Sequence, residues 1–161
     1  MIKKDIHFSV EVYHSVEELK QEDAELLTTA RKITAHAYAP YSNFLVGAVA
    51  MMSNGEMVTG TNQENASYPV GLCAERVLLS CAASQYPGVP IETIAISYDN
   101  TKGTSNHPIS PCGICRQTLA EYQDRVNQPI RILMSGKTGE VHIIENVRQL
   151  LPLSFGASDM Q

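Results

Sequence analysis

Residues 110–119 read SPCGICRQTL, and the two cysteines in this stretch decide how the rest of the chain is interpreted. Cys112 and Cys115 are three residues apart, directly after a proline and at the start of a predicted helix. Thiols in a first helical turn lie near unpaired amides and the positive end of the helix dipole, which favours the thiolate form. The stretch therefore predicts a redox pair, half of a structural zinc site or half of a catalytic metal site.

A third cysteine favours the metal site over the redox pair. Cys73 opens a second predicted helix, CAERVLLSCAAS, at residues 73–84. Cys81 lies about 12 Å further along that helix, at ~1.5 Å per residue, which is too far for both thiols to bind one ion. We expect Cys81 to be a buried core residue, and we interpret His107 as a loop histidine. Three thiolates and one open position are typical of catalytic zinc, whereas a closed structural site needs four ligands.

Two charged residues follow Cys73 closely enough to serve such a site. Glu75 can converge on the same cavity if Cys73 stands at the very start of the helix, although a glutamate in a first turn also simply suits the dipole. Arg76 shares a helical face with Cys73 and can donate hydrogen bonds to metal-bound sulfur, the alternative being a surface arginine. Zn²⁺ with three thiolates carries a net charge of about −1, so these hydrogen bonds would help to acidify a bound water.

The remaining patterns predict an α/β fold with a central sheet of about five strands and helices packed on it. Ser15 begins SVEE, which fits a capping box ahead of a long helical stretch that Pro40 ends. Asn54-Gly55 predicts a hairpin turn in which both residues take positive φ. Residues 6–13 alternate as an extra edge strand or an ordered arm would. The expected strands are residues 44–52, 56–62, 91–99, 130–135 and 140–144, and the expected helices after the first are 73–84, 112–123 and 147–151.

The composition limits the partners of the chain. With 161 residues we expect one domain, residues 1–161, with residues 1–24 as a candidate N-terminal extension. The net charge of −5 and the scattered basic residues argue against binding to nucleic acid. No apolar run approaches the ~20 residues that span a membrane, and no signal or transit peptide is evident. We therefore expect a cytoplasmic protein with no membrane partner, in which clustered cysteines bind metal rather than form disulfides.

Four segments resemble the small cytidine deaminases, and CAE (73–75) followed by PCGIC (111–115) resembles the signature of the wider zinc deaminase superfamily. The four segments are YAPYSNFLVGAV (38–49), GTNQENASYPVGLCAER (60–76), SPCGICRQTLAEY (110–122) and LLPLSFG (150–156). The resemblance extends over residues 25–156. It implies a three-layer α/β/α fold with a mixed sheet, and zinc-dependent hydrolytic deamination of cytidine and 2′-deoxycytidine in pyrimidine salvage.

The resemblance also implies a role for individual residues. Cys73, Cys112 and Cys115 would hold Zn²⁺, while Glu75 would carry the proton. The members that this chain resembles are homotetramers with shared active sites, which implies a homotetramer here. The implied substrate contacts are Asn62 and Glu64 on the ribose hydroxyl, Phe44 near the pyrimidine, the stretch Ala66 to Tyr68 along the base pocket, and Phe155 in a neighbouring subunit's site.

The ribose contacts have independent support from the sequence. Asn62 and Glu64 alternate at the end of a strand, so their side chains leave the same face, and an amide with a carboxylate suits a sugar diol. A polar strand end is the alternative. Gln63 stands where the family more often has valine or isoleucine, which leaves the substrate preference open. Three other functions remain: a deaminase of another aminated base or nucleoside, a structural zinc site in a binding module, and a deaminase of RNA or DNA.

Overall fold

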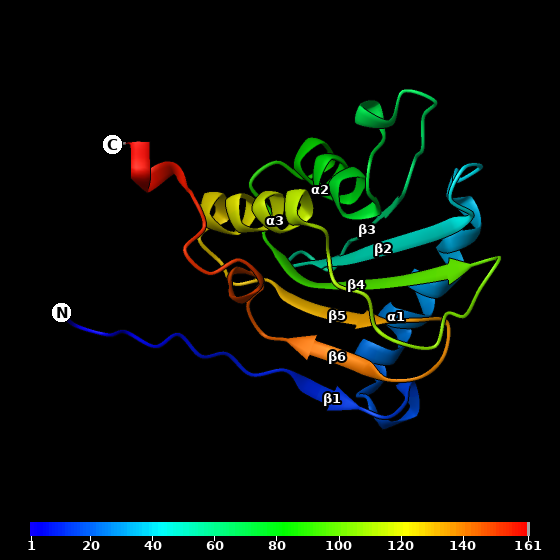
Figure 1. Ribbon diagram of the computed structural model, residues 1–161, viewed down its shortest axis with the longest axis horizontal. Coiled ribbons are helices and arrows are strands. Elements are labelled where there is room, and N and C mark those ends of the chain that lie inside the picture. Colours follow the sequence, from blue (N-terminus) through cyan, green and yellow to red (C-terminus); the bar gives the residue numbers. More distant parts are fainter. Residues whose placement is uncertain (161) are drawn as a thin grey trace.

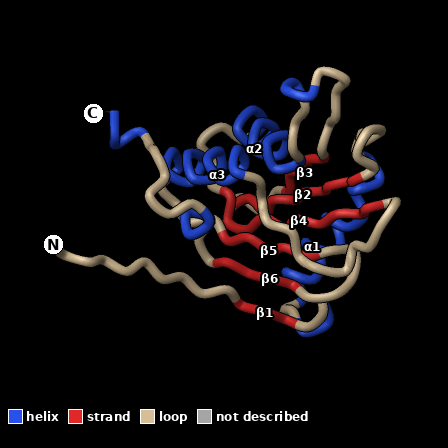
Figure 2. The backbone as a smooth tube through the Cα atoms, viewed as in Figure 1, coloured by secondary structure: helices blue, strands red, loops and turns tan. Residues whose placement is uncertain are grey.

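The computed structural model, in which residues 1–160 are described, is a layered α/β arrangement (Figure 1). Six strands form one mixed sheet in the order β1-β6-β5-β4-β2-β3, with α1 on one face and α2 and α3 on the other (Figures 1 and 2). The strands are β1 (Glu11–Tyr13), β2 (Phe44–Met52), β3 (Met57–Thr61), β4 (Ile91–Asn100), β5 (Arg131–Ser135) and β6 (Val141–Ile144), and the α-helices are α1 (Gln21–Ile33), α2 (Ala74–Gln85) and α3 (Gly113–Val126). The expected α/β/α layering is confirmed.

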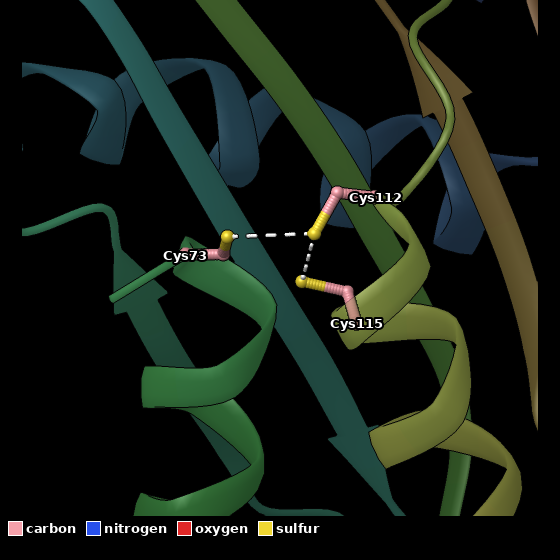
Figure 3. Close-up of side chains that lie close together, drawn as sticks. All are labelled: Cys73, Cys112 and Cys115. Atoms are coloured by element: carbon pink, nitrogen blue, oxygen red, sulfur yellow. Dashed lines mark hydrogen bonds between the residues drawn. The ribbon is translucent and has the colours of Figure 1, made fainter. Parts of the chain in front are cut away.

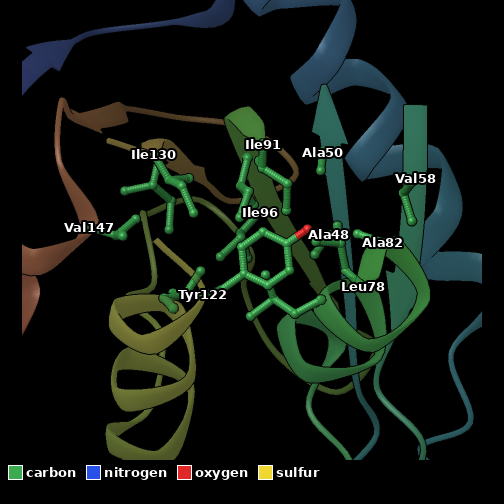
Figure 4. Close-up of a cluster of buried hydrophobic side chains, with 14 of the residues drawn as sticks. Ala48, Ala50, Val58, Leu78, Ala82, Ile91, Ile96, Tyr122, Ile130 and Val147 are labelled. Atoms are coloured by element: carbon green, nitrogen blue, oxygen red, sulfur yellow. The ribbon is translucent and has the colours of Figure 1, made fainter. Parts of the chain in front are cut away.

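Two separate apolar cores follow from the alternation of side chains along the buried strands. Ala48 and Ala50 of β2 face α2 and α3, whereas Val49 between them faces α1. Figure 4 shows the first core, in which Leu78 from α2 and Tyr122 from α3 pack against the sheet. Because successive strand residues point to opposite faces, a central strand between two helical layers must be apolar at nearly every position. This explains the continuous run FLVGAVAMM in β2.

Strand directions bring the first residues of α2 and α3 to the same end of the sheet. β2 pairs antiparallel with both β3 and β4, so the start of β2 lies beside the ends of its two neighbours, with Phe44 opposite Asn100 and Gly47 opposite Thr61. The chain leaves β3 for α2 and leaves β4 for α3, and β4 pairs in parallel with β5 after the α3 crossover. Both helices therefore begin next to each other, which is the usual place for a site in such a fold.

The N-terminal region differs from the prediction. The expected capping box is wrong, because the Ser15 side chain makes no cap hydrogen bond and the Glu18 carboxylate accepts from the amide of His14 at 2.9 Å. A 3-10 turn (Val16–Glu18) ends in extended Leu19, and α1 begins only at Gln21. This break lets Val16 and Leu19 pack against the α1 core. The sheet gains a sixth strand because residues 11–13 pair with β6.

Two further predicted elements are present, but their backbone conformations differ from the prediction. The hairpin between β2 and β3 is confirmed, but only Gly55 takes a positive φ, of 84°. Asn54 instead accepts a hydrogen bond from the amide of Glu56 through its side chain, as in an Asx turn. The expected short helix at residues 147–151 is a 3-10 turn (Val147–Leu150), and further 3-10 turns cover Thr34–His36, Tyr68–Val70 and Ala157–Met160. No helix in residues 1–160 is both long enough and apolar enough to cross a membrane.

Gly60 sets how closely α2 approaches the sheet. A Cβ atom at this position would lie 2.4 Å from the carbonyl oxygen of Ala74 and 2.4 Å from the amide nitrogen of Leu78, both in the backbone of α2. Since neither atom belongs to a flexible side chain, any larger residue must push the first turn of α2 away from β3. Gly60 thus fixes the position of the helix that carries Cys73 at its start.

We predict that Gly60→Ala lowers the free energy of unfolding by about 1–3 kcal/mol, the usual cost of overpacking. Gly113→Ala is the matched control, because a Cβ there has no heavy atom within 4 Å and alanine favours a helix. Urea unfolding followed by circular dichroism measures both changes. Equal unfolding midpoints for the Gly60→Ala and wild-type proteins would contradict the proposed close approach.

Candidate active site

Three cysteine sulfurs converge where α2 and α3 begin (Figure 3). Cys73 is the N-cap residue of α2, Cys112 is the N-cap residue of α3, and Cys115 lies in the first turn of α3. The Sγ atoms of Cys73 and Cys112 are 3.7 Å apart, those of Cys112 and Cys115 are 3.4 Å apart, and all three lie within 4.8 Å of one another. The predicted convergence of these thiols on one point is confirmed.

The spacing and the chemistry of this cluster both fit Zn²⁺. Zinc–sulfur bonds of about 2.3 Å in a tetrahedral site place two sulfurs about 3.8 Å apart, close to the separations observed. A hydrogen bond with Cys115 lowers the pKa of Cys73 to about 6, and the same interaction, together with burial, raises the pKa of Cys115. Thiolates are the ligands that Zn²⁺ binds in cysteine sites, and metal binding releases the thiol protons.

The other sulfur and the nearest histidine lie outside this cluster. Cys81 is half-buried and packs against the core between the sheet and α2. The Nδ1 atom of His107 lies 3.2 Å from the hydroxyl oxygen of Tyr98, so this ring is engaged with a buried tyrosine. Within residues 1–160, the groups that could hold a metal are the three converging cysteines, which leaves a fourth position open.

Glu75 lies within the same site despite its separation of two residues from Cys73. Cys73 has the extended backbone of an N-cap residue, with φ −73° and ψ 153°, so regular helical spacing does not apply between the two side chains. The Glu75 side chain is buried, with 6% of the residue exposed, and burial raises the pKa of its carboxyl group. It lines one cavity of about 370 Å³ together with Cys73 and Cys112. This volume is in the range of sites for small organic ligands.

Asn62 and Glu64 lie on the wall of that cavity, each held by the backbone. The Asn62 side chain accepts from the amide of Val46 at 2.7 Å and donates to the carbonyl of Phe44 at 2.8 Å. The Glu64 carboxylate accepts from the amides of Tyr41 and Ser42 at 2.9 and 3.3 Å. Slight desolvation opposes ionisation, but hydrogen bonds from Ser42 and Tyr41 outweigh it and lower the pKa of Glu64. The cavity therefore presents a fixed carboxylate beside an orienting amide.

The other residues implied in substrate binding occupy different surroundings. The Phe44 ring stacks on Tyr98, with centroids 4.7 Å apart and planes 14° apart. Tyr68 lines the cavity, is 74% exposed, and meets Tyr41 edge to face. Ala66 is exposed on the same loop. Phe155 is 60% exposed and does not line this cavity of its own chain; its carbonyl accepts from Gln117 at 2.9 Å.

Two arginines support the cysteines in different ways. Arg76 is half-buried, and its charge adds to the Cys115 hydrogen bond in lowering the pKa of Cys73. Arg116, which sequence reasoning missed, donates to the carbonyls of Pro111 at 2.8 Å and Leu150 at 3.0 Å. It ties the segment before α3 to the turn after β6. The sequence offered no signal for this role, because the partners are carbonyl groups, which carry no residue-specific pattern.

Comparison with known proteins agrees with this site. Residues 20–128 match the family model described as the cytidine and deoxycytidylate deaminase zinc-binding region. A cytidine deaminase of Halalkalibacterium halodurans is 36% identical over 135 residues, which cover 84% of this chain and 95% of that protein. One of Mycobacterium tuberculosis is 35% identical over 134 residues, covering 81% of this chain and 87% of that protein.

A solved structure extends the agreement to the fold. The crystal structure of cytidine deaminase from Burkholderia pseudomallei superposes with a TM-score of 0.71 at 33% identity, covering 85% of this chain and 100% of that one. The family match, the relatives and the shared fold together place this α/β/α chain and its three-cysteine site among the zinc-binding deaminases. The chain belongs to the cytidine and deoxycytidylate deaminase zinc-binding family.

We predict one zinc ion per chain in the wild-type protein and in Cys81→Ala, because Cys81 lies outside the converging sulfurs. Cys73→Ala leaves two thiols and loses most of the metal. Metal analysis after dialysis, with circular dichroism to confirm folding, distinguishes the two variants. Loss of zinc from a folded Cys81→Ala protein would contradict the ligand assignment.

Proposed function

We propose that this chain hydrolyses cytidine and 2′-deoxycytidine to uridine and 2′-deoxyuridine with release of ammonia, in cytoplasmic pyrimidine salvage. The observation that carries the proposal is a buried carboxyl group, Glu75, in the same cavity as a three-thiolate metal cluster that has an open fourth position. Similar proteins named cytidine deaminase support the choice of nucleoside. The cavity volume of about 370 Å³ suits one nucleoside.

The proposed chemistry divides between the metal and one carboxyl group. Zn²⁺ held by Cys73, Cys112 and Cys115 would supply a water of lowered pKa. Glu75 would accept a proton from the water that attacks C4 of the pyrimidine and would deliver this proton to N3. It would then carry the second proton, from the new hydroxyl group on C4, to the exocyclic amine, so that the C4–N bond breaks, a carbonyl forms at C4 and ammonia leaves. Burial raises the pKa of Glu75, which makes its carboxylate a stronger proton acceptor.

Substrate recognition is proposed to begin with the ribose. Glu64 is held in its ionised form by backbone amides, and it can accept from the 3′-hydroxyl group. Asn62 uses its oxygen and one N–H on the backbone of β2, so its second N–H remains for the sugar. Phe44, Ala66 and Tyr68 would enclose the pyrimidine. Arg76 would moderate the negative charge of the thiolates.

We predict that Glu75→Gln keeps its zinc and its fold but loses a factor of about 10²–10⁴ or more in turnover, because the proton carrier is removed. Glu92→Gln, which changes an exposed carboxylate of β4, serves as the control and retains wild-type activity. The assay follows uridine formation and zinc content in the same samples.

Two outcomes would contradict the proposal. Activity of Glu75→Gln within tenfold of wild type would remove the assigned role of Glu75. A fully zinc-loaded wild-type protein that releases no ammonia from cytidine or 2′-deoxycytidine would remove the proposed substrates. In that case a panel of other aminated nucleosides and bases identifies the substrate of the related deaminase.

We also propose that residues 1–161 act as one domain within a homotetramer whose subunits complete each other's sites. Phe155 is exposed on a C-terminal segment and stands outside the cavity of its own chain, while the rim of that cavity carries the exposed Tyr68. An aromatic ring from a neighbouring copy would cover the bound nucleoside and exclude water. The cytoplasm would keep the three thiols reduced.

We predict that the wild-type protein sediments as a tetramer and that Phe155→Ala raises KM for cytidine roughly 10- to 150-fold with zinc content unchanged. Loss of a covering aromatic contact removes about 1.5–3 kcal/mol of apolar burial. Met160→Ala, an equally exposed change on the same segment, is the control. A fully active monomer at assay concentration would show that each chain builds its site alone.

A further inference from the structure

The first ten residues form an arm that runs away from the body of the protein as an extended chain ahead of β1 (Figures 1 and 2). Apolar side chains recur at every second position, and Ile6, Phe8, Val10 and Val12 are 53, 48, 39 and 51% exposed. Side chains two apart on an extended chain share a face, so these four form one apolar stripe. An arm that remained in water would gain nothing from this pattern, which is typical of a strand with one face against another element.

The arm leads directly into an unprotected edge of the sheet. β1 is the terminal strand, and it pairs with β6 through Glu11–Ile143, Val12–His142 and Tyr13–Val141. In the described part of the chain no strand pairs with the opposite edge of β1. An open edge of this kind is a template for pairing with a further strand. The arm and the edge together are therefore a donor and an acceptor for strand addition.

The sequence of the arm selects a second copy of itself as its partner. In an antiparallel pair of identical strands, a single residue lies on the twofold axis, and the residues on either side face each other. A register centred on Ser9 places all four apolar residues opposite one another, Ile6 facing Val12 and Phe8 facing Val10. Such apolar pairs stabilise adjacent strands.

Charged residues favour the same register. Centring on Ser9 places His7 opposite Glu11, a favourable pair, and Asp5 opposite Tyr13. Centring on Phe8 instead places Asp5 opposite Glu11, a pair of like charges that is destabilising. Centring on Val10 leaves Ile6 opposite a polar partner, His14. Among these neighbouring registers, the one on Ser9 matches the whole apolar stripe and the charges.

We propose that residues 5–13 of two copies of this chain pair as antiparallel strands centred on Ser9, so that each arm adds a strand to the partner's sheet beside β1. In this register residues 5–7 of one copy cover residues 11–13 of the other, which protects both open edges. The two β1 strands are displaced by six residues, about 20 Å, so the bodies of the two copies do not collide at the edge. The family match begins at residue 20, so the contact is separate from the zinc-binding region and independent of the deaminase chemistry.

Disulfide trapping tests the register directly. In a Cys81→Ala background the remaining native cysteines are the three of the metal cluster, and these stay zinc-bound during mild oxidation. Ser9→Cys brings two thiols opposite each other, at a Cα separation of about 4.5–5.5 Å, which suits a disulfide. We expect the zinc-loaded protein to form a covalent dimer that a reducing agent reverses.

Matched variants distinguish cross-linking in the proposed register from cross-linking by random contact between arms. Asp5→Cys places its two thiols about 27 Å apart in the same register, so it forms no dimer. Ile6→Cys mixed with Val12→Cys forms a mixed dimer, although neither variant dimerises alone. Equal cross-linking of Ser9→Cys and Asp5→Cys would show random contact between arms and overturn the proposal. Absence of cross-linking at Ser9 would also overturn it.

Discussion

The fold depends on the close backbone contact between β3 and the first turn of α2. Gly60 allows this contact, because its missing side chain leaves room for the carbonyl of Ala74 and the amide of Leu78. The position of α2 then determines where Cys73 stands relative to α3, and hence whether three sulfurs can share one ion. A displacement of even 1 Å would exceed the tolerance of a tetrahedral zinc site. The geometry of the metal site therefore depends on the packing of α2 against β3 at Gly60.

The electrostatics of the site are consistent with the same arrangement. Two helices direct their positive ends toward the sulfurs, and Arg76 adds a further positive charge. These groups compensate three thiolates that would otherwise weaken the acidifying effect of the metal. Glu75 lies beside them in a buried position that raises its pKa, whereas hydrogen bonds keep Glu64 ionised. The surroundings thus shift the pKa values of two carboxyl groups of one cavity in opposite directions, which suits the proposed roles of proton transfer for Glu75 and hydrogen bonding for Glu64.

The N-terminal arm concerns the open edge of the sheet at β1 and not the active site. A sheet that ends in a strand of three residues has little of its own to protect that edge, and the arm preceding it carries the apolar face of a strand. Pairing between the arms of two copies covers the open edge of β1 and the apolar face of the arm, and it adds a contact outside the zinc-binding region. Since the family match begins at residue 20, this contact can vary without any change to the chemistry.

The sequence by itself placed Cys73, Glu75, Cys112 and Cys115 at the starts of two helices, predicted an α/β fold and carried the motifs that resemble the zinc deaminases, because helix starts, short motifs and apolar periodicity are local features. It failed at residues 15–20, where the partly buried Val16 and Leu19 pack against the core and the expected capping box does not form. Only the tertiary structure decided that Asn62 bridges the backbone of β2, that Phe44 stacks on Tyr98 and that Arg116 binds the distant carbonyl of Leu150. Each of these contacts joins segments far apart in the chain, and side chains that bond to backbone groups leave no periodic trace in the residues they meet.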